Sequence, residues 1–272
     1  MKEYDITASI VLYNTDIEEV NNVVREFQKL NLINRLFLVD NSPTDILKKA
    51  FNSFENIEYI FTGKNVGFGS GHNVAIRKVK NISRYHVVLN ADIQFDKQVL
   101  ETMYHYMNNN EDVGLLAPKI LNMDGSTQYS AKLLPTPINL IIRRFIPIKK
   151  IQEYFDYRYE LRFSNFNKII EVPYVMGCFM FINCKVFDIV KGFDERFFMY
   201  PEDIDLTRRI HEHFKTLYFP KTVIYHKHGK GSYKSFRLLY YHITSMIKYF
   251  NKWGWIFDKS RRDINKKTLA QF

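Results

Sequence analysis

The sequence predicts an α/β protein with a mostly parallel central sheet flanked by helices. Two observations lead to this fold class. Short apolar segments rich in β-branched residues alternate with segments of helical periodicity through the first half of the chain. Polar residues follow these apolar segments at the points where they end. Because strand–helix–strand units pair in parallel through right-handed crossovers, we expect a ligand site at the carboxyl ends of the strands.

The elements of the first half follow in order along the chain. Apolar residues that recur on one face predict a helix over 16–30. A second helix is expected to begin after Gly67, Gly69 and Gly71 and to run to 79. The strands that these helices connect are expected at 6–13, 36–39, 57–61 and 86–89.

The second half has a different pattern. An apolar, β-rich segment at 172–182 precedes a short helix at 185–190, and a strand is expected at 222–225. A further helix is expected to open at 201 and to reach about 214. Between the halves, 132–168 mixes prolines, basic residues and apolar residues, so we expect an irregular excursion over the surface.

The C-terminal part contains an amphipathic helix that allows two interpretations. Basic residues flank its apolar face, and Trp253 and Trp255 follow it. Such a helix either lies in a lipid interface or packs its apolar face on the domain core. The apolar face comprises Phe236, Leu239, Tyr240, Ile243, Met246, Ile247 and Phe250.

Composition bounds the class of protein. The chain has 272 residues, 46% hydrophobic and 25% charged, which excludes a disordered chain and a membrane bundle. The N-terminus lacks the basic-then-apolar layout of a signal peptide. Cys178 and Cys184 lie in a strand-like segment, where six residues span about 20 Å, too far for a disulfide. We therefore expect a reduced, cytosolic protein.

Most of the positive charge lies at the C-terminus. The net charge is +10, and residues 227–272 contain 11 basic and 2 acidic residues, so they carry +9 of it. This excess suggests attachment to nucleic acid or to anionic lipid, or it is a solvated tail. Nucleic acid is the least favoured of these, since its binding domains usually carry basic residues across the domain itself.

Three groups of residues could carry chemistry. Asp92 follows the fourth strand and could ligate Mg²⁺ or Mn²⁺ bridging a diphosphate, although Asp is also common in turns. Glu202, Asp203 and Asp205 crowd a helix start; one can cap the helix, and mutual repulsion raises a pKa toward that of a general base. His226 follows a strand and could bind metal or phosphate, or be an ordinary surface histidine.

Taken together, the segments resemble glycosyltransferase family two, and most closely its bacterial branch of rhamnosyltransferases. The resemblance covers about residues 5 to 232. It implies the GT-A fold over 1–226, with a nucleotide-binding half at 1–117 and an acceptor-binding half at 118–226, followed by a basic amphipathic extension at 227–272. The matching motifs are Ser9–Asn14, Val39–Ser42, Asn65–Gly69 with His72–Asn73, Leu89–Asp92, Gly177–Met180, Gly192–Leu206 and His226–Ser232.

The resemblance also implies roles for single residues. Asp203 would be the catalytic base, supported by Glu202, and Asp92 with His226 would hold Mg²⁺ or Mn²⁺. The wider family has Asp-x-Asp where this chain has Asn90–Ala91–Asp92, so one carboxylate is missing. Gly177, Cys178 and Asp205 would contact the acceptor. The donor nucleotide would be bound by Tyr13, Asn14, Asp40, Asn41, Gly67, Asn73, Asn90 and Ala91.

The function implied by the resemblance is inverting sugar transfer. The expected reaction moves L-rhamnose from dTDP-rhamnose to a saccharide or a polyprenyl-diphosphate-linked acceptor in bacterial surface polysaccharide (O-antigen or capsule) synthesis. Alternatives are a UDP-hexose-dependent enzyme of the same family and an inactive nucleotide-sugar-binding module. The expected location is the cytoplasm, peripheral on the inner face of the membrane through its anionic surface, with no nucleic acid partner.

Overall fold

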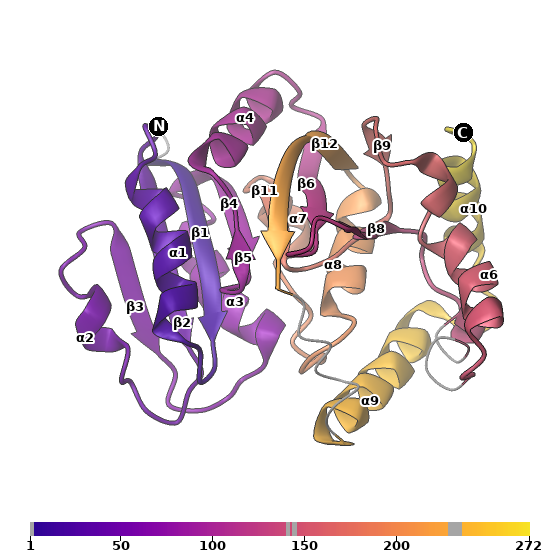
Figure 1. The fold of residues 1–272 in the computed structure, drawn as a ribbon, viewed down its shortest axis with the longest axis horizontal. Coiled ribbons are helices and arrows are strands. Elements are labelled where there is room, and N and C mark those ends of the chain that lie inside the picture. The colour runs from indigo at the N-terminus through magenta and orange to yellow at the C-terminus, as the bar shows by residue number, and fades with distance from the viewer. Residues whose placement is uncertain (1–2, 140–141, 143–145, 228–235) are drawn as a thin grey trace.

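A computed structural model describes residues 3–139, 142, 146–227 and 236–272. One ten-stranded sheet runs through the molecule in the order β3-β2-β1-β4-β11-β6-β12-β5 (Figure 1). Two further strands of this sheet lie off that order: β7 pairs with β6, and β9 pairs with β12. The four strands of the first half are mutually parallel, as the sequence predicts. They are β1 (Tyr4–Leu12), β2 (Asn34–Asp40), β3 (Ile57–Phe61) and β4 (Ser83–Leu89).

Helices cover both faces of this parallel part. α1 and α4 pack with β1 in one apolar core, while α3 packs on Phe37 and Val39 of β2 from the other face. α1 begins after Asp16, whose carboxylate accepts a hydrogen bond from the amide of Glu18. The helices are α1 (Ile17–Gln28), α2 (Lys48–Phe51), α3 (Phe68–Val79) and α4 (Lys97–Asn108).

The second half adds strands to the same sheet. β11 (Phe179–Asn183) lies antiparallel between β4 and β6 (Val113–Leu121), and β12 (Lys215–His226) runs parallel to β6. The segment predicted as one strand at 172–182 is divided by a turn, so that prediction is wrong in its extent. The short strands are β5 (Ile93–Gln94), β7 (Thr127–Gln128), β9 (Ile170–Glu171) and a separate pair, β8 (Ala131–Lys132) with β10 (Tyr174–Val175).

The segment at 132–168 is more ordered than expected. It contains the last residue of β8, the helix α6 (Lys149–Tyr159) and a 3₁₀ turn (Arg162–Ser164). Apolar side chains from this segment enter a second apolar core, which also contains Leu115 of β6 and Met180 of β11. The segment therefore does not run over the surface alone. Those side chains are Leu133, Leu134, Tyr159, Leu161 and Phe166.

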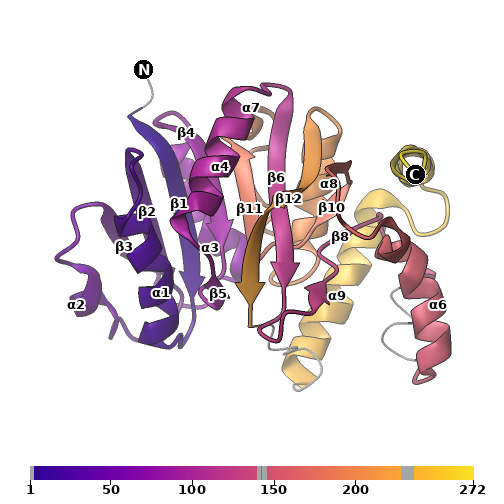
Figure 2. The same cartoon turned by 45° about the horizontal axis from the view of Figure 1, so that its top comes forward.

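Of the two C-terminal helices, the first lies beside α8 (Glu202–His211) and the last lies beside α6, away from α7 (Val186–Val190) (Figures 1 and 2). α9 (Phe236–Trp253) places Tyr249 and Phe250 in the second core and leaves other apolar side chains exposed. Packing on the core is therefore confirmed for the end of this helix, and contact of its exposed apolar side chains with lipid stays a prediction. α10 (Lys259–Leu269) completes the chain. Among the described residues, no helix combines the length and apolarity that a membrane span needs.

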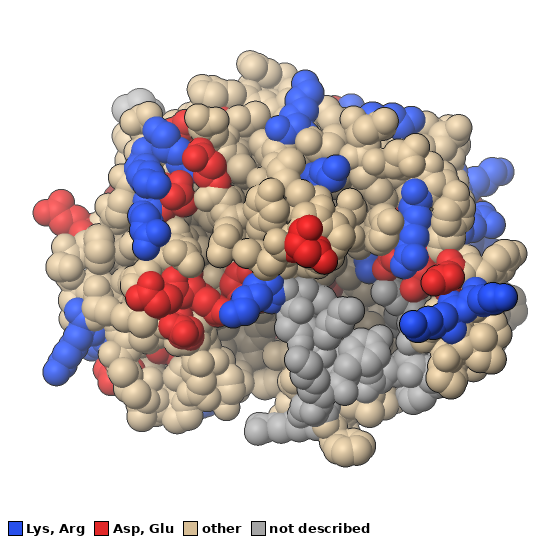
Figure 3. All heavy atoms as spheres, viewed as in Figure 1, with Lys and Arg blue, Asp and Glu red and all other residues tan. Residues whose placement is uncertain are grey.

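Acidic and basic side chains lie interspersed on the face of the molecule drawn in Figure 3. No continuous basic field covers the described part of that face. The net charge of +10 is therefore not gathered there into the kind of single surface that attracts a polyanion.

Candidate active site

The carboxyl ends of the parallel strands meet at one edge, as predicted. The backbone amide of Asn41, after β2, donates to the carbonyl of Leu12 at the end of β1 at 2.8 Å. The amide of Asn14 donates to the hydroxyl of Ser42 at 2.8 Å. Tyr13 and Asn14 are exposed at this edge, which leaves them accessible to a ligand.

Asp40 lies at the same edge but faces inward, with 1% of its surface exposed. Its Oδ1 accepts from the amide of Ser42 at 2.8 Å, and its Oδ2 accepts from the hydroxyl of Tyr59. Burial and the hydrogen bond to Asp40 raise the pKa of Tyr59, which keeps that hydroxyl a donor. A nucleotide base would reach Asp40 only after Tyr59 turned away.

Asn41 and Gly67 hold the start of α3. The side-chain nitrogen Nδ2 of Asn41 donates to the carbonyl of Gly67 at 3.1 Å, and its side-chain oxygen Oδ1 accepts from the hydroxyl of Thr62. Gly67 has φ 91°, and a Cβ there would collide with the carbonyl of Phe198. α3 begins at Phe68, so Gly69 and Gly71 belong to the helix and not to a loop around phosphate. The structure gives these glycines a packing role.

Asn73 has a different place from the one expected. Its amide nitrogen donates to the carbonyl of Phe193 and to Glu195, each at 2.9 Å, and its oxygen accepts from the amide of Phe193 at 2.8 Å. The side chain is buried. Because all of its polar atoms bind the 193–195 loop, the expectation that Asn73 contacts the ribose is wrong for this structure.

Asp92 and His226 lie together, as the resemblance implied. The Nε2 of His226 is 3.3 Å from Oδ1 of Asp92 and 3.5 Å from the amide of Asn90, and its Nδ1 is 3.0 Å from Oε1 of Gln128. The pairing of β12 with β5 sets His226 opposite Ile93, next to Asp92. Gln128 holds the histidine ring through its Nδ1, on the side away from Asp92. The sequence pattern did not indicate Gln128 as part of the site.

The charge state of this pair follows from its contacts. Burial lowers the pKa of His226, but hydrogen bonds to Asp92 and Cys178 outweigh burial and raise it to about 10. Burial raises the pKa of Asp92, but His226 lowers it more. Within the described residues no group of three or more His, Cys, Asp and Glu gathers as a metal site. A carboxylate oxygen beside an imidazole nitrogen fits a divalent cation that also takes diphosphate oxygens once the cation displaces the proton that Nε2 of His226 shares with Asp92.

Asp203 is tied to the same region through a turn at Gly177 and Cys178. The amide of Gly177 donates to Oδ2 of Asp203 at 3.1 Å, and the amide of Ile204 donates to Oδ1 at 2.8 Å. The next residue, Cys178, contacts His226 and accepts from the amide of Asn90 at 3.0 Å. Gly177 and Cys178 are consecutive, with Cα atoms about 3.8 Å apart, so this turn contacts Asp203 through one residue and His226 through the next.

The turn itself is closely packed. A Cβ on Gly177 would lie 3.1 Å from Cβ of Asp203 and 3.4 Å from the ring of Phe68. Cys178 is buried in the first core beneath His226. Gly177 and Cys178 therefore position other side chains, and their side-chain positions offer little surface to an acceptor.

Burial changes the acidity of the Glu202–Asp203 pair. Burial and the neighbouring Asp203 raise the pKa of Glu202. Burial also raises the pKa of Asp203, opposed by the amides of Gly177 and Ile204 and by the charge of Lys132. Oε2 of Glu202 is buried without a hydrogen-bond partner among the described residues.

Lys132 was not anticipated from the sequence. It lies in β8 opposite Tyr174 of β10, and its ammonium donates to Oε1 of the buried Glu160 at 2.9 Å. The pairing of β8 with β10 brings this cation near Asp203. A single lysine between the halves carries no sequence signal for this position, because its strand partner lies 42 residues later.

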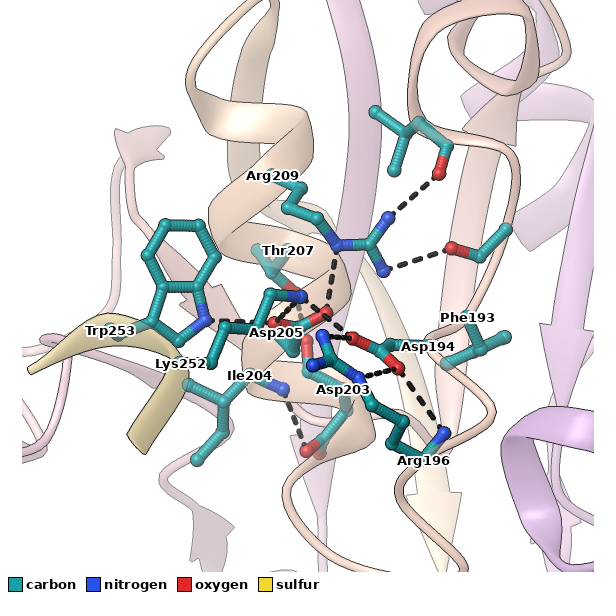
Figure 4. Close-up of polar contacts among 12 residues, drawn as sticks. Phe193, Asp194, Arg196, Asp203, Ile204, Asp205, Thr207, Arg209, Lys252 and Trp253 are labelled. Carbon is teal, nitrogen blue, oxygen red and sulfur yellow. Dashed lines mark hydrogen bonds and ion pairs between the residues drawn. The ribbon is translucent and has the colours of Figure 1, made fainter. Parts of the chain in front are cut away.

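Asp205 faces away from Asp203 (Figure 4). It is fully buried and accepts from Arg209 at 2.7 Å and from the indole of Trp253 at 2.8 Å, and it pairs with Lys252 at 2.6 Å. Direct contact with an acceptor, as expected from the sequence, is thus excluded by its surroundings. Asp205 instead joins α8 to α9.

Comparison with solved structures shows the fold. The chain resembles GalNAc-T7 in a crystal structure with UDP, GalNAc and Mn²⁺ (TM-score 0.61, 13% identity, 82% of this chain and 43% of that one). It also resembles Staphylococcus aureus TarS 1–349 (TM-score 0.55, 14% identity, 82% and 60%). The mixed, mostly parallel sheet flanked by helices is the GT-A fold of glycosyltransferases.

The chain belongs to glycosyl transferase family 2, whose family model matches residues 8–190. It is 27% identical over 229 residues to the N-acetylglucosaminyl-diphospho-decaprenol L-rhamnosyltransferase of Mycobacterium tuberculosis, covering 78% of this chain and 73% of that protein. It is 25% identical over 228 residues to rhamnosyltransferase WbbL of Escherichia coli (79% and 81%). The low-salt glycan biosynthesis hexosyltransferase Agl10 of Haloferax volcanii is 26% identical over 209 residues; the match covers 75% of this chain and 61% of that relative's length.

Proposed function

We propose that the chain is an inverting glycosyltransferase with Asp203 as its general base. The observation that carries the proposal is the Gly177–Cys178 turn, which contacts Asp203 on one side and the Asp92–His226 pair on the other. One group can thus take a proton from an acceptor hydroxyl while the other faces the leaving diphosphate. A single displacement inverts the anomeric carbon and needs no enzyme nucleophile.

Asp203 rather than Glu202 is the charged member of the acidic pair in this proposal. Two backbone amides donate to Asp203, and such bonds favour an ionised carboxylate. Glu202 keeps the proton, since Oε2 has no partner among the described residues and burial disfavours its charge. The remaining lone pairs of Asp203 can accept the acceptor hydroxyl.

Asp92 and His226 would hold Mg²⁺ or Mn²⁺, with Asn90 and Ala91 beside them. Their oxygen and nitrogen donors fit such a cation, and GalNAc-T7 was crystallised with Mn²⁺. When bound, the cation would neutralise charge on the leaving diphosphate. Asp92 orients His226 through their 3.3 Å contact, and Gln128 holds the other ring nitrogen.

For the donor we propose dTDP-L-rhamnose. Two relatives are named rhamnosyltransferases, although Agl10 is named only as a hexosyltransferase. Tyr13 and Asn14 would contact the nucleotide, and Asp40 would meet the base after displacement of Tyr59. The half at 1–117 would bind the donor and the half at 118–226 the acceptor. A UDP-hexose is the competing donor, and an inactive binding module the competing class.

The acceptor proposed is a saccharide carried on a polyprenyl diphosphate, in surface polysaccharide (O-antigen or capsule) synthesis. The name of the mycobacterial relative includes a diphospho-decaprenol. Such a substrate would place the chain at the inner face of the cytoplasmic membrane, attached peripherally. The basic extension at 227–272 agrees with an anionic surface there.

A donor panel tests the proposal. Purified protein is given dTDP-L-rhamnose, UDP-glucose or UDP-N-acetylglucosamine with a lipid-linked N-acetylglucosamine acceptor, and release of nucleoside diphosphate is measured. We expect acceptor-dependent release with dTDP-L-rhamnose above the other donors. Faster release from a UDP-sugar would replace the donor, and no release with any donor would favour the inactive module.

A further inference from the structure

We propose that one face of α9, continued by the loop after it, docks on an anionic lipid surface. The inference deepens the membrane location proposed above and rests on it, because it names the residues that make the contact. The docking face consists of Phe236, Tyr240, Ile243 and Ile247 with Trp255, Ile256 and Phe257.

The docking face is apolar and uncovered. Its four helical members follow one another at intervals of four, three and four residues, which aligns them along one side of the helix. Their exposed fractions are 92% for Phe236, 64% for Tyr240, 38% for Ile243 and 42% for Ile247. Clustered exposure of this kind marks an interaction surface rather than the scattered apolar residues of an ordinary surface.

The loop after α9 continues this surface. Trp255, Ile256 and Phe257 are exposed in succession, Phe257 at 89%. The loop is fixed at its end, because the next residue, Asp258, is buried and forms an ion pair with Arg208. Three consecutive large apolar side chains on a fixed loop, one of them a tryptophan, suit the boundary between head groups and acyl chains.

The surrounding charge favours an anionic partner. Lys248 is exposed next to Ile247, and the described part of α10 exposes the basic residues Lys259, Arg262, Lys266 and Lys267. The acids beside them are fewer: Asp263 of α10, and Glu171 and Glu212, which line a pocket with Lys259 and Lys267. Each basic residue near an anionic bilayer adds about 1 kcal/mol of attraction. A second copy of this chain paired about a twofold axis would set this excess of positive charge against itself.

The C-terminal turns of α9 hold the docking face in place. Tyr249 and Phe250 are buried, and Lys252 and Trp253 bond to Asp205 of the helix that carries Asp203. In Figures 1 and 2 the start of α9 and the carboxyl ends of the parallel strands point to the same edge of the molecule. A membrane against α9 would therefore lie at the edge where a lipid-linked acceptor must enter.

Vesicle flotation of the full-length protein tests this inference. The probes are vesicles of phosphatidylcholine alone and of phosphatidylcholine with phosphatidylglycerol. The test variant is Ile243→Glu with Ile247→Glu. The matched control is Ile33→Glu with Ile46→Glu, since both isoleucines are exposed in the nucleotide-binding half. All four substitutions replace an exposed isoleucine, which makes loss of folding a minor concern.

We expect the wild-type protein and the control variant to float with anionic vesicles, and added salt to weaken this binding. The test variant should bind these vesicles at least about tenfold more weakly. Equal binding by the test variant, or no binding by wild type, overturns the inference. So does a wild-type dimer in light scattering that the test variant loses. In a parallel assay, the release of nucleoside diphosphate is measured with a soluble acceptor analogue. Activity without vesicle binding would contradict only the docking face. Vesicle binding without activity would contradict only the proposed sugar transfer.

Discussion

At the scale of single residues, the site depends on a close approach of backbone to carboxylate. The amide of Gly177 donates to Asp203, and Gly177 has no Cβ to hold that carboxylate away. The conformation of Gly177 lies outside the left-handed region, so spacing rather than backbone freedom accounts for the glycine. The observed position of the proposed base therefore requires that residue 177 has no side chain.

Gly177→Ala tests this dependence. The new Cβ would lie 3.1 Å from Cβ of Asp203, so the carboxylate must move by a few tenths of an ångström. We expect turnover to fall about tenfold or more while donor affinity is kept. Steady-state kinetics and donor titration measure the two effects. Gly125→Ala is the control for loss of folded protein, because nothing lies within 4 Å of its Cβ position and the substitution adds only the backbone strain of a φ of 83°. An unaffected turnover in Gly177→Ala would show that the turn does not position the proposed base.

Three histidines with little or no exposed surface predict loss of stability in mild acid. Burial lowers the pKa of His72 well below its ordinary 6.5, that of His86 to about 3 and that of His211 to about 4. The unfolded chain therefore binds more protons below pH 6.5, and the free energy of unfolding falls as pH drops toward 4. The slope is about 1.4 kcal/mol per pH unit for each histidine.

Urea denaturation across this pH range measures that slope. His211→Gln should flatten it by about one proton, since it removes one of the three histidines whose pKa burial lowers. Carboxylates titrate equally in both proteins and cancel in the difference. An identical slope in the variant would show that His211 does not remain neutral in the folded state.

At the scale of elements, α8 is the piece that joins the site to the C-terminal helices. Its first turn carries Asp203, its inner side bonds to α9 through Asp205, and Arg208 pairs with Asp258 before α10. Both Arg208 bonds are 2.8 Å, and its guanidinium lies 3.9 Å from the Trp253 ring centre. The described part of the extension, 236–272, is therefore anchored to the helix that carries the proposed base.

Asp258→Ala tests this anchor. The substitution leaves the guanidinium of Arg208 buried without its carboxylate, and it also removes the oxygen that accepts from the amide of Arg261 at the start of α10. We expect the free energy of unfolding to fall by about 3–5 kcal/mol. Denaturant titration measures it against Asp263→Ala, which removes an exposed acid and should cost less than about 0.5 kcal/mol. Equal losses in both variants would refute a structural role for the buried pair.

At the scale of the whole molecule, the sequence predicted the sheet better than the partners of individual side chains. Alternating periodicity is local, so the four parallel strands were predictable and confirmed. The division of 172–182 and the order in 132–168 were not, since both depend on distant strands. Asn73 binds a loop 120 residues later, and Asp205 binds a tryptophan 48 residues later. Such contacts leave no trace in a local pattern.

The metal dependence that we propose would be a property of the assembled site, because Asp92 and His226 come from distant parts of the chain. We expect EDTA to abolish most nucleoside diphosphate release, and excess Mg²⁺ or Mn²⁺ to restore it. The missing first carboxylate of Asn90–Ala91–Asp92 predicts weak binding, so activity should require free metal in the assay. Full activity after exhaustive chelation would assign Asp92 and His226 another role.

The most direct measurement compares turnover and donor binding in Asp203→Asn. The amide keeps the size of the side chain but cannot take a proton from the acceptor. Turnover should fall by about 10²–10⁴-fold, with donor affinity unchanged in calorimetric titration. Near-normal turnover in this variant would contradict Asp203 as the base, and with it the account of sugar transfer at this site.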